Sequence, residues 1–132
     1  MQITGIYAAL GALLLVFLAA RVMRRRTQAR IGIGDGGDHE LLKRIRVHAN
    51  AVEYLPISLI LLLLVELGQT RPLLVHAFGI LVLAGRVLHA FGLSKTSKAS
   101  FGRVGGMLLG LVAIVGMAVL LLWRQVAMAT MQ

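Results

Sequence analysis

Three side chains that form strong hydrogen bonds, those of Arg46, Asn50 and Glu53, enter the start of a long apolar segment. At about 100° per residue, the steps of four and three residues place them within roughly 60° of each other on one helix face. The nine residues that follow Pro56, residues 57–65, are all apolar or small. A cation, an amide and a carboxylate at the boundary of such a segment form a candidate site for a polar ligand.

Other polar side chains are candidates for the same site. Arg21 and Arg103 lie at the ends of two other apolar segments, and His89 lies near the end of a third. Together with Tyr54 and the cluster around Asn50, they would line a pocket for an anionic ligand, because the planar guanidinium group pairs well with carboxylates. The alternative for Arg21 and Arg103 is that their side chains extend toward lipid phosphates.

Two charged residues lie inside apolar segments and need partners. A charge at the centre of a membrane helix costs about 2.5–3.5 kcal/mol, so Glu53 and Arg86 are not expected to face lipid. At about 1.5 Å per residue, they lie roughly 6 and 10 Å from the ends of their segments. We therefore expect an ion pair between Glu53 and Arg86, with Arg46 as a second partner of the carboxylate.

The composition is typical of an integral membrane protein. Of the 132 residues, 58% are hydrophobic and 14% are charged, whereas soluble domains have roughly 45–50% and 25%. Each membrane span needs about 20 residues. We therefore predict an all-α membrane protein with one domain, residues 1–132, and four spans at about residues 3–23, 49–68, 73–93 and 101–123.

Individual residues predict a helix cap, a kink and a close contact between helices. Asp38 follows a glycine-rich stretch, and its carboxylate is expected to cap the next helix by accepting hydrogen bonds from first-turn amides. Pro56 removes a helical hydrogen bond and is expected to kink the second span. Small residues permit close contact between membrane helices. In the last segment these are Gly102, Gly105, Gly106 and Gly110.

The formal net charge of +9 predicts an orientation rather than a nucleic-acid partner. The basic residues lie between apolar segments, without interleaved aromatic residues or a basic folded face. Most of them fall in residues 24–46 and 95–103, and the other side has Arg71 and Arg124. By the positive-inside rule, both basic loops are cytoplasmic and both termini face outward.

Two kinds of site chemistry are not supported by the sequence. There is no cysteine, so a thiol would have to come from a ligand. His39, Glu40, His48, Glu53 and His89 are potential metal ligands, but their spacing does not match a metal site, and we predict none.

The stretch RVHANAVEYLP, residues 46–56, resembles the second-helix pattern of the MAPEG family, the membrane-associated proteins of eicosanoid and glutathione metabolism. GRVLH, residues 85–89, and Arg21 at the end of the first segment extend the resemblance, as do the loop lengths and the four spans. The Gly-Asp-Gly-Gly loop, residues 34–37, is similar to a bacterial branch of the family.

This resemblance implies a homotrimer in a bacterial inner membrane that binds glutathione between neighbouring subunits near the cytoplasmic face. The bound thiol would react with lipophilic electrophiles or hydroperoxides, as in a glutathione transferase or peroxidase. Arg103 matches the arginine that stabilises the thiolate, and a nearby cation does lower the pKa of a thiol. The matched glutathione contacts are Arg46, Asn50, Glu53, Tyr54 and His89, with Arg21 coming from the neighbouring subunit.

Two departures from the family pattern leave other functions open. Leu93 stands where several members have a tyrosine, and Arg103 matches only with a one-residue shift in the preceding loop. One alternative is a non-enzymatic scaffold that binds lipid or a partner protein. Another is a small exporter that uses Glu53 for proton coupling, against which stand the nearby arginines and the aromatic content of 5%.

Overall fold

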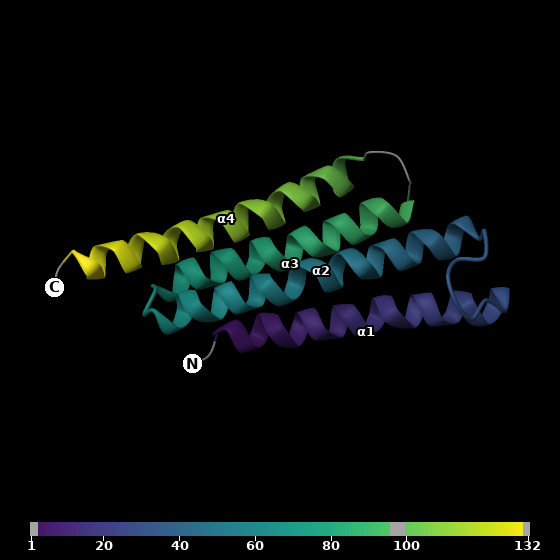
Figure 1. Ribbon diagram of the computed structural model, residues 1–132, viewed down its shortest axis with the longest axis horizontal. Helices are drawn as coiled ribbons and strands as arrows, with labels where there is room; N and C mark the ends of the chain where they lie inside the picture. The colour runs from purple at the N-terminus through teal and green to yellow at the C-terminus, as the bar shows by residue number, and fades with distance from the viewer. Residues whose placement is uncertain (1–2, 96–99, 131–132) are drawn as a thin grey trace.

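The chain forms a bundle of long antiparallel helices. The computed structural model describes residues 3–95 and 100–130, and in these ranges it contains α1 (Ile3–Ala29), α2 (His39–Leu67), α3 (Pro72–Lys95) and α4 (Phe101–Ala129). All four are long and apolar enough to cross a membrane, and they run side by side in alternating directions (Figure 1). The predicted all-α, four-span architecture is therefore confirmed, while the trimer stays a prediction.

The helices extend beyond the predicted spans, because polar residues continue the helical hydrogen bonding outside the apolar stretches. α1 continues to Ala29, α4 continues to Ala129, and α2 begins at His39 and passes through Pro56 as a single helix. The predicted basic loop at residues 94–100 lies in part outside the described residues, which stop at 95 and resume at 100.

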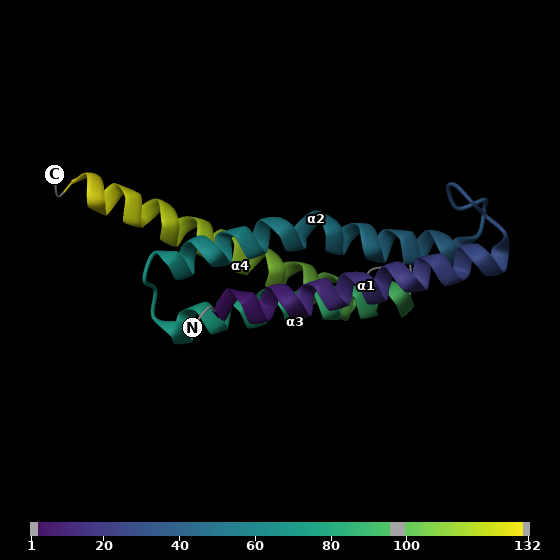
Figure 2. The ribbon, with the colours of Figure 1, turned by 90° about the horizontal axis from the view of Figure 1, so that it is seen from below.

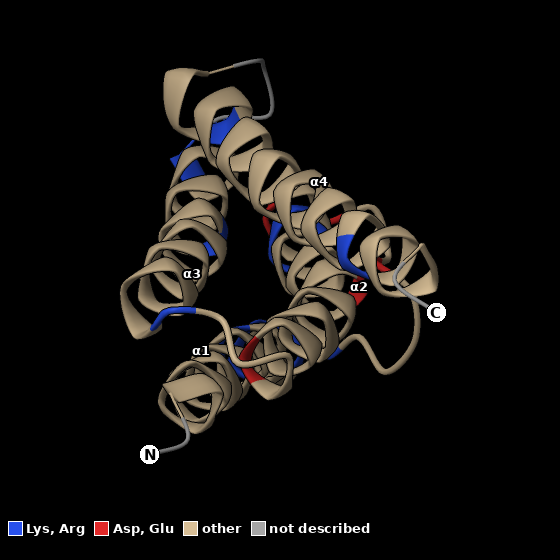
Figure 3. Cartoon of the chain, turned by 90° about the vertical axis from the view of Figure 1, so that its left-hand side faces the viewer, with Lys and Arg blue, Asp and Glu red and all other residues tan. Residues whose placement is uncertain are grey.

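The middle of the bundle is formed by α2 and α3. These two contact each other, α1 packs against both on one side, and α4 packs against both on the other; α1 and α4 do not touch within the described residues. Figure 3 shows this arrangement along the bundle, and Figure 2 shows the C-terminal part of α4 extending past the other helices. In the most apolar part of each helix only 22–39% of the residues are buried. Most of the apolar surface therefore faces outward, as expected in lipid.

Glycines allow α3 and α4 to approach closely. A Cβ atom built on Gly85 would lie 2.8 Å from the carbonyl oxygen of Gly106, and one on Gly106 would lie 2.6 Å from that of Gly85. Gly110 leaves room for the side chain of Arg86. The predicted close contact is thus confirmed here and at Gly102, but it is wrong for Gly105, where a Cβ atom would have no other atom within 4 Å. Gly105 faces away from α3.

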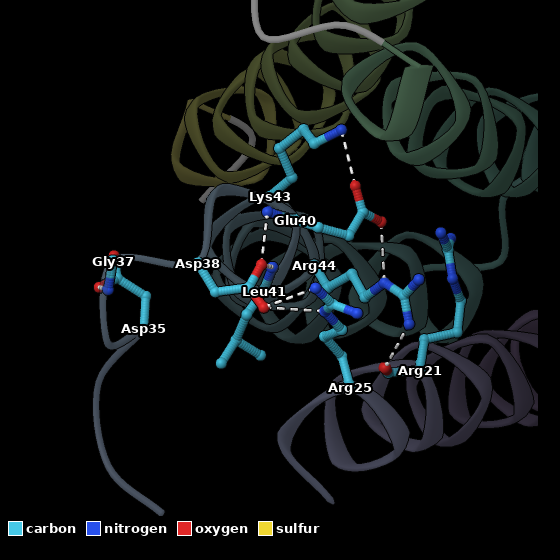
Figure 4. Close-up of polar contacts among 9 residues, drawn as sticks. All are labelled: Arg21, Arg25, Asp35, Gly37, Asp38, Glu40, Leu41, Lys43 and Arg44. Atoms are coloured by element: carbon cyan, nitrogen blue, oxygen red, sulfur yellow. Dashed lines mark hydrogen bonds and ion pairs between the residues drawn. The ribbon is translucent and has the colours of Figure 1, made fainter. Parts of the chain in front are cut away.

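The connection between α1 and α2 is held by Asp38. Its Oδ1 accepts hydrogen bonds from the amides of Glu40 (2.9 Å) and Leu41 (3.0 Å), which confirms the predicted cap. Its Oδ2 lies 2.8 Å from Nη2 of Arg25, as Figure 4 shows. The Leu41 amide and, after it, the Arg25 guanidinium hold the pKa of the Asp38 carboxyl below its usual range, although desolvation opposes this. The polar turn thereby joins two helices.

The opposite end of the bundle contains contacts that the sequence did not predict. The amides of Ile3 and Thr4, at the start of α1, donate hydrogen bonds of 2.6 and 2.8 Å to the two carboxylate oxygens of Glu66 on α2. The Tyr7 hydroxyl lies 3.0 Å from Nδ1 of His76 on α3 and donates to that residue's carbonyl oxygen at 3.2 Å. These bonds tie α1 to both central helices.

Candidate functional site

A cavity of about 600 Å³ lies between α2, α3 and α4, near the end of the bundle that carries the basic loops. This volume falls within the roughly 300–1,000 Å³ that is typical of ligand sites. The structure brings six of the predicted site residues to its walls. They are Arg46, Asn50, Glu53, Tyr54, His89 and Arg103.

Four of these residues come from α2, and helical spacing predicted a shared face for three of them, Arg46, Asn50 and Glu53. Asn50 is buried and lies deepest, whereas Arg46 and Glu53 are exposed in the single chain and lie on the open side of the cavity. The remaining wall includes apolar side chains from the beginning of α4, among them Met107 and Leu108. The cavity therefore combines charged groups with an apolar surface.

Arg86 lies beside this cavity but has a different partner from the one predicted. Its Nη1 donates a 2.9 Å hydrogen bond to Oδ1 of Asn50, and its guanidinium carbon lies 4.8 Å from the centre of the Tyr54 ring. No ion pair between Glu53 and Arg86 is present in the residues that the structure describes. The predicted ion pair between Glu53 and Arg86 is therefore wrong.

The reason for the correction is rotational. Tyr54 and Glu53 flank Asn50 at about 40° on one side and about 60° on the other around the helix axis. Arg86, which is only 2% exposed, reaches α2 on the Tyr54 side of Asn50, where α3 and α4 cover it. Glu53 points to the exposed side.

His89 connects α3 to α4 at the cavity wall. Its Nδ1 lies 3.0 Å from the backbone carbonyl oxygen of Arg103, and the residue is only 4% exposed. The neighbouring amide of Arg103 is bound by the side chain of Ser100, the N-cap of α4, at 3.3 Å. The cap and the histidine together fix the first turn of α4, from which the Arg103 side chain extends to the cavity.

Arg21 does not line the cavity within one chain. Its Nη1 donates to the Ser94 hydroxyl at 3.2 Å, and its carbonyl oxygen accepts from Arg44, whose Nε binds Glu40 at 3.0 Å. Figure 4 shows Arg21 and Arg44 in this network at the end of the bundle. The expectation that Arg21 lines the pocket together with the other residues is not met within one chain. Its assignment to a neighbouring subunit's site stays a prediction.

The fold and the cavity agree with one class of membrane protein. The MAPEG family model matches residues 4–123, so the chain belongs to the MAPEG family, and the resemblance inferred from the sequence is confirmed.

Two relatives of known name are similar to this chain. They are the inner membrane protein YecN from Escherichia coli strain K12 and the protein of the same name from Escherichia coli O6:H1. Each is 45% identical over 91 residues, which cover 69% of this chain and 70% of the relative. Their name gives a membrane location and no activity.

Proposed function

We propose that this protein binds glutathione, or a similar thiol, in the cavity between α2, α3 and α4. The bound thiolate then reacts with a lipophilic electrophile or hydroperoxide that enters from the bilayer. The observation that carries the proposal is that one cavity gathers all the positions that match the family's glutathione contacts and thiolate stabiliser, apart from Arg21.

The charges at the cavity suit this ligand. Glutathione has two carboxylates and one ammonium group. The guanidinium of Arg46 can pair with a carboxylate through two parallel hydrogen bonds, and Glu53, which has no ion pair within the described residues, suits the ammonium. Asn50 accepts a hydrogen bond from Arg86 through Oδ1, so its amide nitrogen is left to donate to the ligand.

Arg103 is the proposed thiolate stabiliser. A cation close to the sulfur favours the charged form of the thiol and so increases the fraction of the nucleophile. The thiolate forms a carbon–sulfur bond with an electrophile as its leaving group departs with the bonding electrons, or attacks the terminal oxygen of a hydroperoxide as the O–O bond breaks. The apolar part of the wall, with Leu93, Met107 and Leu108, suits a lipophilic second substrate.

The proposed assembly is a homotrimer, in which the neighbouring subunit supplies Arg21. Arg46 and Glu53 are exposed in the single chain, and exposed charges on a membrane helix are costly. Their exposure supports a second copy that covers the open side of the cavity. We further propose that the protein lies in a bacterial inner membrane, as the name of YecN states for that relative, with cytoplasmic basic loops and outward termini.

Calorimetry with the purified protein tests the binding proposal. Glutathione should bind the wild type, and Arg46→Ala should weaken binding by at least tenfold, because a charge-assisted hydrogen bond contributes about 1.5–3 kcal/mol. Arg24→Ala is the matched control, since Arg24 is exposed on α1 and does not line the cavity. A wild-type protein that does not bind glutathione would overturn the proposal.

The second candidate is the non-enzymatic scaffold that binds lipid or a partner protein. It is favoured by Leu93, which lines the cavity with an alkyl side chain where several family members have a tyrosine hydroxyl. Turnover of chlorodinitrobenzene separates the two candidates. An enzyme should turn over this substrate and lose rate on Arg103→Ala, whereas a scaffold should give no turnover in either form.

A further inference from the structure

We propose that His89 accepts the proton of the bound thiol through its Nε2 atom. The inference rests on the proposed function, and it adds a catalytic residue with a defined protonation state. It follows from the backbone contact of the histidine rather than from its presence in the cavity alone.

The contact with Arg103 fixes the tautomer of His89. A carbonyl oxygen only accepts hydrogen bonds, so Nδ1, which lies 3.0 Å from that of Arg103, must carry a hydrogen. In the neutral imidazole the other nitrogen, Nε2, then has a free lone pair. The ring is 4% exposed and cannot turn freely without losing this bond. The acceptor is therefore held in one orientation.

The lone pair of Nε2 is available to a ligand. His89 lines the cavity, and its one hydrogen bond in the described part of the chain is made by Nδ1. Within the described residues, Oγ1 of Thr4 is the fully buried side-chain atom that has no hydrogen-bond partner. Nε2 of His89 also has no partner among these residues, but it is not fully buried, so a ligand can reach it. Nε2 is therefore both unbonded and accessible.

The other polar groups at the cavity are less suited to accept the proton. The guanidinium groups of Arg46 on α2 and Arg103 on α4 are donors only, as is that of Arg86 behind the wall. The Oδ1 atom of Asn50 is already bound to Arg86.

Two possible proton acceptors remain besides His89, and both are on α2. Glu53 lies on the exposed side of the cavity, and the oxygen of the Tyr54 phenol already carries a proton. Histidine is the side chain whose ordinary pKa, about 6.5, suits proton exchange near neutral pH.

The proposed step conserves atoms and charge. The thiol gives its proton to Nε2 and keeps the bonding electron pair on sulfur, which leaves a thiolate beside Arg103 and an imidazolium at His89. With a hydroperoxide, the thiolate attacks the terminal oxygen and the O–O bond breaks. The thiol sulfur is oxidised to a sulfenic acid, and the proton on Nε2 passes to the departing alkoxide to give an alcohol.

Two variants separate the roles of the two ring nitrogens. In His89→Asn the amide nitrogen can replace Nδ1 as the donor to Arg103, and the Nε2 acceptor is lost. We expect kcat with chlorodinitrobenzene at saturating glutathione to fall about 10²- to 10⁴-fold near neutral pH, which is a larger loss than the fall in glutathione affinity. The rate should recover at high pH, where the thiol ionises without a base. His89→Gln, which cannot keep the Nδ1 bond, should lose affinity as well.

A second measurement on the wild type does not depend on a variant that folds. Ultraviolet absorbance reports thiolate formation, and calorimetry in two buffers of different ionisation enthalpy reports proton release. The inference predicts thiolate formation with little net proton release, because His89 retains the proton. Thiolate formation with one proton released, or binding without thiolate, would overturn it.

The kinetic outcomes are equally decisive. If His89→Asn binds glutathione and keeps the wild-type rate and pH profile, the role of His89 is wrong and the proposed function stands. If the wild type does not bind glutathione, the proposed function fails, and this inference fails with it.

Discussion

Nη1 of Arg86 on α3 lies 2.9 Å from Oδ1 of Asn50 on α2, and this bond joins a buried cation to the wall of the cavity. Arg86 is 2% exposed and forms no ion pair with a carboxylate in the described chain. Its other contacts are the Gly106 carbonyl oxygen at 3.4 Å and the face of the Tyr54 ring. Arg86 therefore orients the Asn50 amide and places positive charge behind the candidate site.

This relationship predicts strong coupling between the two residues. Asn50→Ala leaves a buried guanidinium donor without its acceptor, which should lower the free energy of unfolding by about 1–3 kcal/mol. Arg86→Met in the same chain removes that unpaired donor, so the double variant should be more stable than the sum of the single effects predicts. Denaturation in detergent of the four proteins of this cycle measures the coupling. Additive effects would mean that the bond is not formed.

The glycine contact between α3 and α4 predicts opposite effects at adjacent positions. Gly106→Ala places a Cβ atom 2.6 Å from the Gly85 carbonyl oxygen, and such overpacking should cost about 1–3 kcal/mol of stability. Gly105→Ala meets no atom within 4 Å and should be neutral or stabilising by up to about 1 kcal/mol, because alanine favours the helix. Thermal denaturation in one detergent compares the two. Equal effects would contradict the close packing of α3 on α4.

The helices and the site face of α2 could be predicted from the sequence, whereas the partners of individual side chains could not. The positions of Arg46, Asn50 and Glu53 on one face depend only on local helix geometry. The choice between Asn50 and Glu53 as partner of Arg86 depends on how α3 is rotated against that face, and a difference of about 60° decides it.

Contacts between residues far apart in the chain also could not be predicted from the sequence pattern. Glu66 binds the amides of Ile3 and Thr4 across 62 or more positions in the chain. These bonds require the first turn of α1 and the last turn of α2 to lie at the same position along the bundle axis. Hydrophobic periodicity contains no information on the relative position of two helices along that axis. A carboxylate near the end of an apolar helix does indicate that a partner is needed.

The Glu66 contact predicts local fraying when it is removed. The carboxylate serves as an N-cap for α1, and loss of a capping group costs about 0.5–2 kcal/mol. In Glu66→Ala, hydrogen exchange of the first turns of α1 should become faster. Glu53→Ala is the control, because Glu53 has no hydrogen bond within the described residues and faces the cavity. Unchanged exchange in Glu66→Ala would show that the cap does not hold α1.

The cap at Asp38 predicts a pH dependence. Because the folded pKa of Asp38 is held below its usual range, mainly by the Leu41 amide and then by Arg25, its contribution to stability is present above the unfolded value of about 3.9. It is lost as the pH falls through the folded value. Asp38→Asn keeps a cap acceptor but not the charge, so its deficit in Tm relative to the wild type should shrink below about pH 4. A deficit that is the same at all pH values would contradict this assignment.

A density map of the purified protein after addition of glutathione tests the central claim most directly. We predict density for the ligand in the cavity beside Asn50, His89 and Arg103, with Arg46 at a ligand carboxylate. We also predict that a second copy of the chain covers the open side and contributes Arg21. A map in which the cavity stays empty at saturating glutathione, or in which the ligand lies elsewhere, would contradict the account.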